Sequence, residues 1–259
     1  MDTGFLTRVI VDGGEARRYT VYVPGDYDPD RRWPAILFLH GAGEGGRDGL
    51  LPTEYQLGSA IRRDAARYPG LAIFPQCRDY QWVWSSVDVD FAMRVLDQVR
   101  TDFSVDSDRI YLTGVSTGAK AAWHALFRHA EVFAAALIVA GVLQPRRPNG
   151  ETTSHQRLAQ RIRDVAVWVF HGDNDPVFPV TDARDVVAAL TSPEAATQPD
   201  GAERAQRAER AERAERRYTE LAGFGHDVWD VAYYSPEVTD WLFAQHRRDP
   251  TRQPPGADA

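Results

Sequence analysis

The stretch IYLTGVSTGA, residues 110–119, joins a short apolar run, a Gly-x-Ser-x-Gly turn and the beginning of a helical pattern. A strand that turns this sharply into a helix raises the central serine above the edge of a sheet, in the arrangement called a nucleophile elbow. The turn requires small residues, because side chains at Gly114 and Gly118 would collide with neighbouring backbone. Such a string is weak evidence alone, but its place between a strand and a helix makes Ser116 the candidate nucleophile.

Eight apolar or β-branched runs predict strands, and six amphipathic segments predict helices. From the third strand onward the two alternate, which indicates a mostly parallel sheet covered on both faces. The first two strands are joined by Asp12-Gly13-Gly14, which predicts an antiparallel hairpin at one edge. We therefore expect an α/β fold with a mostly parallel, eight-stranded sheet. The predicted strands are 7–11, 18–23, 36–39, 71–74, 110–112, 134–140, 167–170 and 217–220; the predicted helices are 53–68, 87–102, 117–129, 154–163, 181–190 and 236–246.

The chain has 259 residues, a length that α/β folds of about 250 residues reach as one domain. We predict a single domain over residues 1–246 and a disordered, proline-rich tail over residues 247–259. Residues 192–217 form a low-complexity insertion of Ala-Glu-Arg triplets. We interpret this insertion as a repeat expansion in a surface loop, with a lid or a partner-binding arm as the alternative.

Composition excludes several classes of protein. The longest apolar run is well short of the roughly 18 residues that a membrane-spanning helix needs. The net charge of −7 argues against a general nucleic-acid binder. The single cysteine, Cys77, rules out an internal disulfide and a cysteine-based metal cluster. The first residues lack the pattern of a secretory signal, so we expect a cytoplasmic protein. No metal is predicted, and the oligomeric state is left open.

A serine nucleophile needs a histidine base, which in turn needs an orienting acid. In chains with a nucleophile elbow, the acid and then the histidine follow the serine. His226 fits this order, because it lies in a glycine-bearing loop after the last predicted strand. Two aspartates follow the preceding strand. We choose Asp175, directly before a proline-bounded turn, and expect Asp173 to tie the loop through backbone amides.

Acyl transfer also needs backbone N–H groups for the developing oxyanion. Thr117, directly after the candidate nucleophile, is expected to supply one of them. The other is expected from the glycine-rich turn LHGAGEGG, residues 39–46, through Ala42 or, as an alternative, Gly43. A phosphate-binding loop is the competing interpretation, but neither known glycine-rich phosphate motif is present and Glu44 would repel phosphate.

Four ordered motifs, LHGAGE at 39–44, FPQC at 74–77, DRIYLTG at 108–114 and GHDVWD at 225–230, carry a family resemblance. The chain resembles the α/β-hydrolase superfamily over roughly residues 5–246. More closely, it is similar to bacterial phospholipase/carboxylesterase-like serine esterases related to feruloyl esterases and polyhydroxybutyrate depolymerases. This resemblance implies Ser116 as nucleophile, Asp175 as acid and His226 as base, with no cofactor and a small-molecule ester as substrate.

Two positions depart from that family pattern. Thr117 and Ala119 stand where such esterases usually have methionine and a second glycine. The oxyanion donor is a backbone group, so Thr117 should leave the mechanism intact while it reshapes the acyl pocket. The family resemblance is therefore only weak evidence about the substrate.

Aromatic residues near the predicted mouth of the site, Trp82, Trp84 and Phe178, could form a substrate-binding wall. Ordinary loop packing is the alternative. The sequence thus predicts a serine carboxylic ester hydrolase with an acyl-enzyme intermediate, acting on short-acyl or aromatic, feruloyl-like esters. A serine peptidase, an amidase or an acyltransferase with the same triad remains open. So does a catalytically silent binding protein.

Overall fold

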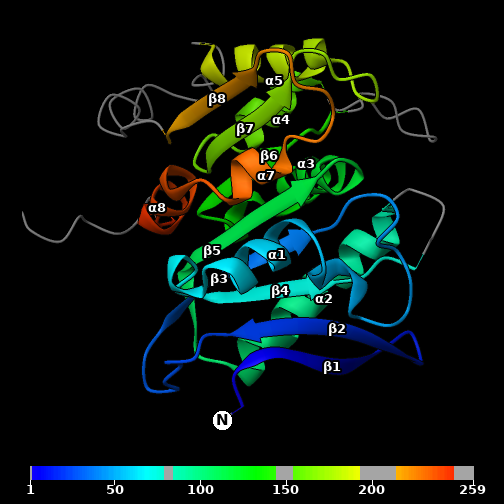
Figure 1. The fold of residues 1–259 in the computed structure, drawn as a ribbon, viewed down its shortest axis with the longest axis vertical. Coiled ribbons are helices and arrows are strands. Elements are labelled where there is room, and N and C mark those ends of the chain that lie inside the picture. Colours follow the sequence, from blue (N-terminus) through cyan, green and yellow to red (C-terminus); the bar gives the residue numbers. More distant parts are fainter. Residues whose placement is uncertain (1, 79–83, 144–153, 193–213, 248–259) are drawn as a thin grey trace, which may run out of the picture.

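Within residues 2–78, 84–143, 154–192 and 214–247, which the computed structural model describes, eight strands form one sheet (Figure 1). Their order across the sheet is β1-β2-β4-β3-β5-β6-β7-β8. β2 pairs antiparallel with β1 and with β4, and every other pairing is parallel. The predicted mostly parallel, eight-stranded sheet is confirmed. The strands are β1 Gly4–Asp12, β2 Glu15–Val23, β3 Trp33–Leu39, β4 Leu71–Pro75, β5 Val105–Val115, β6 Ala135–Val139, β7 Ala166–Gly172 and β8 Arg216–Leu221.

The predicted edge hairpin is also confirmed. Asp12 pairs with Glu15 across a two-residue turn. Gly13 and Gly14 have φ angles of 59° and 85°, which only residues without a Cβ adopt readily.

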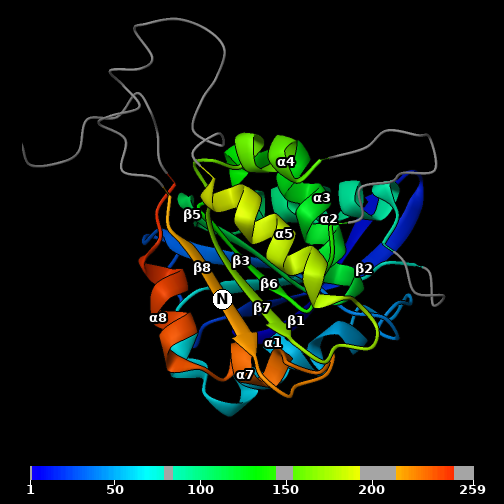
Figure 2. The same ribbon diagram turned by 90° about the horizontal axis from the view of Figure 1, so that it is seen from above.

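Helices cover both faces of the sheet (Figure 2). One face is covered by α2, α3, α4 and α5, and the other by α1, α7 and α8. Side chains of the buried strands alternate between the two cores: Leu37 of β3 belongs to the first, and its neighbours Ile36 and Phe38 to the second. The helices are α1 Gln56–Arg63, α2 Ser86–Asp102, α3 Thr117–His129, α4 His155–Arg161, α5 Val180–Thr191, α7 Trp229–Tyr233 and α8 Pro236–Ala244.

Two helical segments differ from the prediction. The segment predicted as one helix over 53–68 is divided, because Gln56 has a φ of 45° and Asp64 has non-helical backbone with φ −151° and ψ 78°. Within this segment only α1, from Gln56 to Arg63, is α-helical, and a short 3₁₀ turn lies before it and another after it. The second difference is α7, which was not predicted because its five residues are too few to show a helical period.

Several sequence-based expectations lie largely outside the described residues. The tail beyond residue 247 and most of the Ala-Glu-Arg insertion belong to this group. The last two residues of the insertion, Arg216 and Arg217, are the first two residues of β8. In the part of the chain that the structure describes, no helix is long and apolar enough to cross a membrane.

The elbow explains why two glycines flank the candidate nucleophile. A Cβ on Gly114 would meet the backbone of Gly118, and a Cβ on Gly118 would meet the carbonyl oxygens of Leu39 and His40. In each case the obstruction is backbone, which cannot move as a flexible side chain can. The predicted collisions at both glycines are therefore confirmed.

Replacing Gly118 with alanine is expected to lower the free energy of unfolding by about 3 kcal/mol, at the upper end of the cost of overpacking a core. The added methyl group would push the first turn of α3 away from the end of β3. Urea unfolding measures the effect, with Gly25→Ala as the matched control, because a Cβ at Gly25 would meet nothing within 4 Å. Equal stability of the two variants would contradict this account of the elbow.

Candidate active site

Ser116 lies between the end of β5 and the first residue of α3. Its backbone is strained, with φ 54° and ψ −118°, a combination rare for a residue with a side chain. The strained turn is held from behind, because the Ser116 N–H donates to the carbonyl of Val139 at 2.9 Å. The residue is 8% exposed. The elbow thus holds one hydroxyl at the carboxyl edge of the sheet.

The structure brings the three residues of the predicted triad together. His226 Nε2 lies 2.8 Å from Ser116 Oγ, and His226 Nδ1 lies 2.7 Å from Asp175 Oδ2. An ionised carboxylate can only accept, so Nδ1 carries the proton and donates it to Asp175. Nε2 is then free to accept the hydroxyl proton of Ser116. This is the tautomer that a general base beside a serine requires.

Asp175 is held in its ionised form. Its side chain has no exposed surface, and its Oδ1 accepts the backbone N–H groups of Val177 and Phe178 at 2.7 and 2.9 Å. Burial by itself raises the pKa of Asp175, but the hydrogen bonds from His226 and from those two amides outweigh it, so the pKa lies below its usual value. A negative charge therefore faces the His226 ring at neutral pH.

Asp173, the competing acid, has a different position. Its Oδ1 accepts the backbone N–H of Gly223 at 2.7 Å, which ties the loop after β7 to the loop after β8. These are the loops that hold Asp175 and His226. Asp173 ties the loop through a backbone amide, as predicted.

The glycine-rich turn after β3 lies beside the elbow, because Gly118 packs against the carbonyls of Leu39 and His40. Ala42 and Thr117, the residues whose amides were predicted to hold an oxyanion, are both half-buried, whereas Gly43 is exposed. Thr117 is the first residue of α3. The two segments expected to supply N–H groups thus meet at the end of β3.

The buried His40 side chain stabilises the glycine-rich turn after β3. Its Nδ1 lies 2.8 Å from the Gly41 carbonyl, and its Nε2 lies 3.1 Å from the backbone N of Cys77. A carbonyl accepts and an N–H donates, so the ring is the neutral Nδ1–H tautomer. Burial lowers the pKa of His40 to about 4, which keeps the ring neutral. Cys77 itself is buried after β4.

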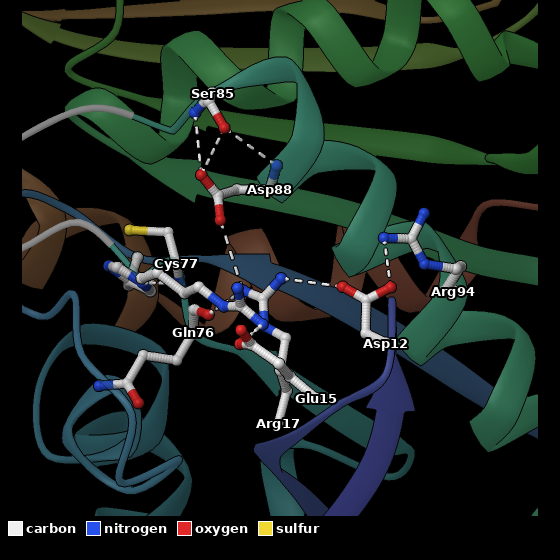
Figure 3. A network of polar contacts seen from close by, with 10 residues as sticks. Asp12, Glu15, Arg17, Gln76, Cys77, Ser85, Asp88 and Arg94 are labelled. Atoms are coloured by element: carbon white, nitrogen blue, oxygen red, sulfur yellow. Dashed lines mark hydrogen bonds and ion pairs between the residues drawn. The ribbon is translucent and has the colours of Figure 1, made fainter.

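A network of ion pairs and hydrogen bonds joins the edge hairpin to the start of α2 and to Gln76, which contacts the glycine-rich turn (Figure 3). The buried guanidinium of Arg17 pairs with Asp12 at 3.2 Å and with Asp88, in the first turn of α2, at 3.3 Å. It also donates to the Gln76 carbonyl at 3.0 Å. The Gln76 side chain continues the chain of contacts, donating to the carbonyl of Glu44 at 3.0 Å. The position of the turn is therefore fixed by contacts that extend to β1.

Glu44, inside the turn, is a buried carboxyl group, 6% exposed. Its Oε1 accepts from the Gln56 side chain at 3.1 Å, whereas Oε2 has no hydrogen-bond partner among the described residues. Burial raises the pKa of Glu44 to about 7, although hydrogen bonds from Gln56 and the Gly41 backbone lower it. The turn therefore contains a carboxyl group that changes charge near neutral pH.

Replacing Glu44 with glutamine is expected to stabilise the protein increasingly as the pH rises from about 4.5 to about 7, and not at lower pH. The unfolded chain ionises at the ordinary pKa of 4.5 and the folded chain near 7, so the folded state binds more protons between these values and the free energy of unfolding falls as pH rises. The variant cannot ionise and should gain about 1–3 kcal/mol over the wild type at about pH 8, and nothing at about pH 4. Urea unfolding at both pH values measures this. A difference that does not change with pH would contradict it.

The three residues of the predicted aromatic wall differ in their positions. The half-buried Phe178 ring lies edge-on to the His226 ring, with 5.4 Å between centroids. Trp84, predicted at the mouth, is instead buried, because its indole N–H donates to the His40 carbonyl at 2.9 Å and its ring packs on the imidazole. Trp82 lies outside the described residues. Trp84 therefore belongs to the support of the turn.

Two further side chains contact the triad and were not predicted as site residues. Trp229, the first residue of α7, lies edge-on to His226 with 6.0 Å between ring centroids. His171, near the end of β7, lies 3.2 Å from Asp175. Its position four residues before the chosen acid, at a strand end, was a signal that could have found it. Within the described residues, no group of three or more His, Cys, Asp or Glu side chains is arranged to hold a metal ion.

The chain matches a known protein family and several known esterases. The family named Esterase, described as "Putative esterase", matches residues 13–229. A bifunctional acetylxylan esterase/xylanase from Neocallimastix patriciarum is 26% identical over 168 residues, covering 63% of this chain and 22% of that protein. "Probable feruloyl esterase C" from Aspergillus niger is 28% identical over 171 residues, covering 63% of this chain and 56% of that protein. The chain thus matches only part of the length of these relatives.

Solved structures share the fold. A thermostable esterase of known crystal structure superposes with a TM-score of 0.74 at 28% identity, covering 94% of this chain and 63% of that one. A mutant of the feruloyl esterase module from Clostridium thermocellum, complexed with sinapinate, has a TM-score of 0.65 at 13% identity, covering 95% and 89%. The second likeness concerns the fold alone. The predicted α/β-hydrolase fold and the resemblance to esterases related to feruloyl esterases are confirmed.

Proposed function

The chain belongs to the Esterase family, and from that premise we propose that it hydrolyses carboxylic esters through a serine acyl-enzyme. The observation that carries the proposal is the continuous chain of contacts from Ser116 Oγ to His226 at 2.8 Å and from His226 to Asp175 at 2.7 Å. A nucleophile, its base and an orienting acid in this order are what acyl transfer needs.

In the proposed reaction, His226 Nε2 takes the proton from Ser116 as Oγ attacks the ester carbonyl carbon. The carbonyl oxygen becomes negative and accepts hydrogen bonds from the backbone N–H groups of Ala42 and Thr117. Asp175 stabilises the imidazolium that forms. His226 then gives its proton to the leaving alcohol, which departs as the carbon–oxygen bond breaks. A water molecule, deprotonated by the same histidine, releases the acid and regenerates the serine.

The substrates we propose are short-acyl or aromatic, feruloyl-like esters of small molecules. Two aromatic rings, Phe178 and Trp229, lie edge-on to His226, where a planar acyl or alcohol group could stack. The names of the relatives, a feruloyl esterase and an acetylxylan esterase, agree with this choice. The domain assignment over residues 1–246 and the cytoplasmic location stay predictions.

The test is a series of p-nitrophenyl esters from acetate to palmitate, together with methyl ferulate, and a fluorophosphonate probe followed by peptide mapping. We expect turnover of the short or aromatic esters and an adduct on Ser116. Faster cleavage of a matched anilide would favour an amidase, and ester formation with an added alcohol would favour acyl transfer. Folded protein that neither turns over any substrate nor takes up the probe would contradict the proposal and favour a binding protein.

A further inference from the structure

We infer that His171 is a positioning residue for the triad, which holds the acid loop in place by donating one N–H group to the Phe178 carbonyl beside Asp175. The inference rests on the proposed function. His171 lies near the carboxyl end of β7, and its side chain has no exposed surface. The described contacts of its ring are with Phe178 and Asp175, so its effect on the chemistry acts through the acid loop.

The contacts of the His171 ring define its tautomer. Nε2 lies 2.9 Å from the carbonyl oxygen of Phe178 and 3.2 Å from Asp175 Oδ2. Both of these oxygens are acceptors, so Nε2 must carry a proton, which it donates to the Phe178 carbonyl. Nδ1 has no hydrogen-bond partner among the described residues. A second proton there would be a buried, unsatisfied donor, which favours the neutral Nε2–H form.

The His171 ring lies against both parts of the acid loop. Asp175 Oδ2 accepts from His226 and lies 3.2 Å from His171 Nε2, while Oδ1 accepts from the amides of Val177 and Phe178. These contacts oppose rotation of the carboxylate away from His226. Because the His171 N–H donates to the Phe178 carbonyl, it fixes the segment whose ring packs against His226.

Glu220, a charged neighbour of His171 on the next strand, is already paired. This residue, the partner of His171 in the pairing of β7 with β8, accepts from both Arg184 Nε and Nη2 at 2.9 and 2.6 Å. The Tyr218 hydroxyl also donates to Glu220, at 2.7 Å. The contact between the His171 ring and a carboxylate is thus directed to Asp175.

Glutamine and methionine form a matched pair of substitutions for the test. They are similar in size and flexibility, but only the glutamine amide can place an N–H near the position of Nε2. We expect His171→Met to lower kcat by about 5- to 10-fold, the value of a hydrogen bond between neutral groups, with KM little changed. His171→Gln should keep at least about a third of the wild-type kcat. Urea unfolding of both variants separates this effect from a loss of stability.

A measurement on the wild-type protein keeps the inference testable if the variants fold poorly. ¹⁵N NMR of histidine-labelled protein should find His171 as the Nε2–H tautomer at neutral pH. A proton on Nδ1, equal kcat for the glutamine and methionine variants, or a methionine variant as active as the wild type would overturn the inference. Absence of any ester turnover in the wild type would instead count against the proposed function.

Discussion

Replacing Ser116 with alanine is expected to lower kcat for ester hydrolysis by roughly 10⁴- to 10⁶-fold, the scale that removal of a triad nucleophile costs in serine hydrolases. The variant lacks the atom that would form the acyl-enzyme, so only the oxyanion donors and substrate binding could still act. KM and the free energy of unfolding should stay near the wild-type values, because Oγ has its described contact with His226 and contributes little to packing.

Ser59→Ala is the matched control. Its hydroxyl also has a described side-chain partner, the Tyr234 hydroxyl at 2.9 Å, and has no described contact with the triad. Initial rates with p-nitrophenyl acetate and the rate of fluorophosphonate labelling should be near wild type in this control and absent in Ser116→Ala. If Ser116→Ala kept more than about a hundredth of the wild-type kcat, the nucleophile would have to lie elsewhere.

The elbow could be predicted from the sequence because its requirements are local. The steric demand of a tight turn fixes Gly114 and Gly118, and the apolar run before them and the helical pattern after them are visible in ten residues. The acid and the base followed from chain order, since the loops after the last parallel strands meet at one edge of the sheet. Local sterics therefore predict Ser116, and the topology of the sheet predicts Asp175 and His226.

The features that the sequence did not reveal depend on contacts between distant segments. Trp84 looked like a residue of the mouth, but its indole reaches the His40 carbonyl, 44 positions earlier in the chain. The burial of Glu44 arises from packing against Gln56 at the start of α1. His171 is the exception, because Asp175 follows it by only four residues; what the sequence does not show is that the turn after β7 folds the acid back against the ring. Such contacts need the three-dimensional arrangement, because no periodicity encodes them.

Replacing Asp175 with asparagine is expected to lower kcat by about 10⁴-fold while the fold stays intact. The asparagine carbonyl can still accept the amides of Val177 and Phe178, which now bond to Oδ1 at 2.7 and 2.9 Å. Its NH₂ group would then take the place of Oδ2 and point two hydrogens at His226 and His171. His226 Nδ1 could only accept there, so the proton would move to Nε2, where it faces the Ser116 hydroxyl. A protonated Nε2 cannot take the serine proton.

Asp173→Asn separates this tautomer effect from a general effect of losing a carboxylate in the same loop. Asp173 uses one oxygen, Oδ1, to accept the Gly223 N–H at 2.7 Å, and an asparagine carbonyl can do the same. We therefore expect kcat near the wild-type value in Asp173→Asn. NMR of His226 should show the Nε2–H tautomer in Asp175→Asn alone. Equal losses of kcat in the two variants would mean that loop charge, and not the tautomer imposed by Asp175, determines the activity of the base.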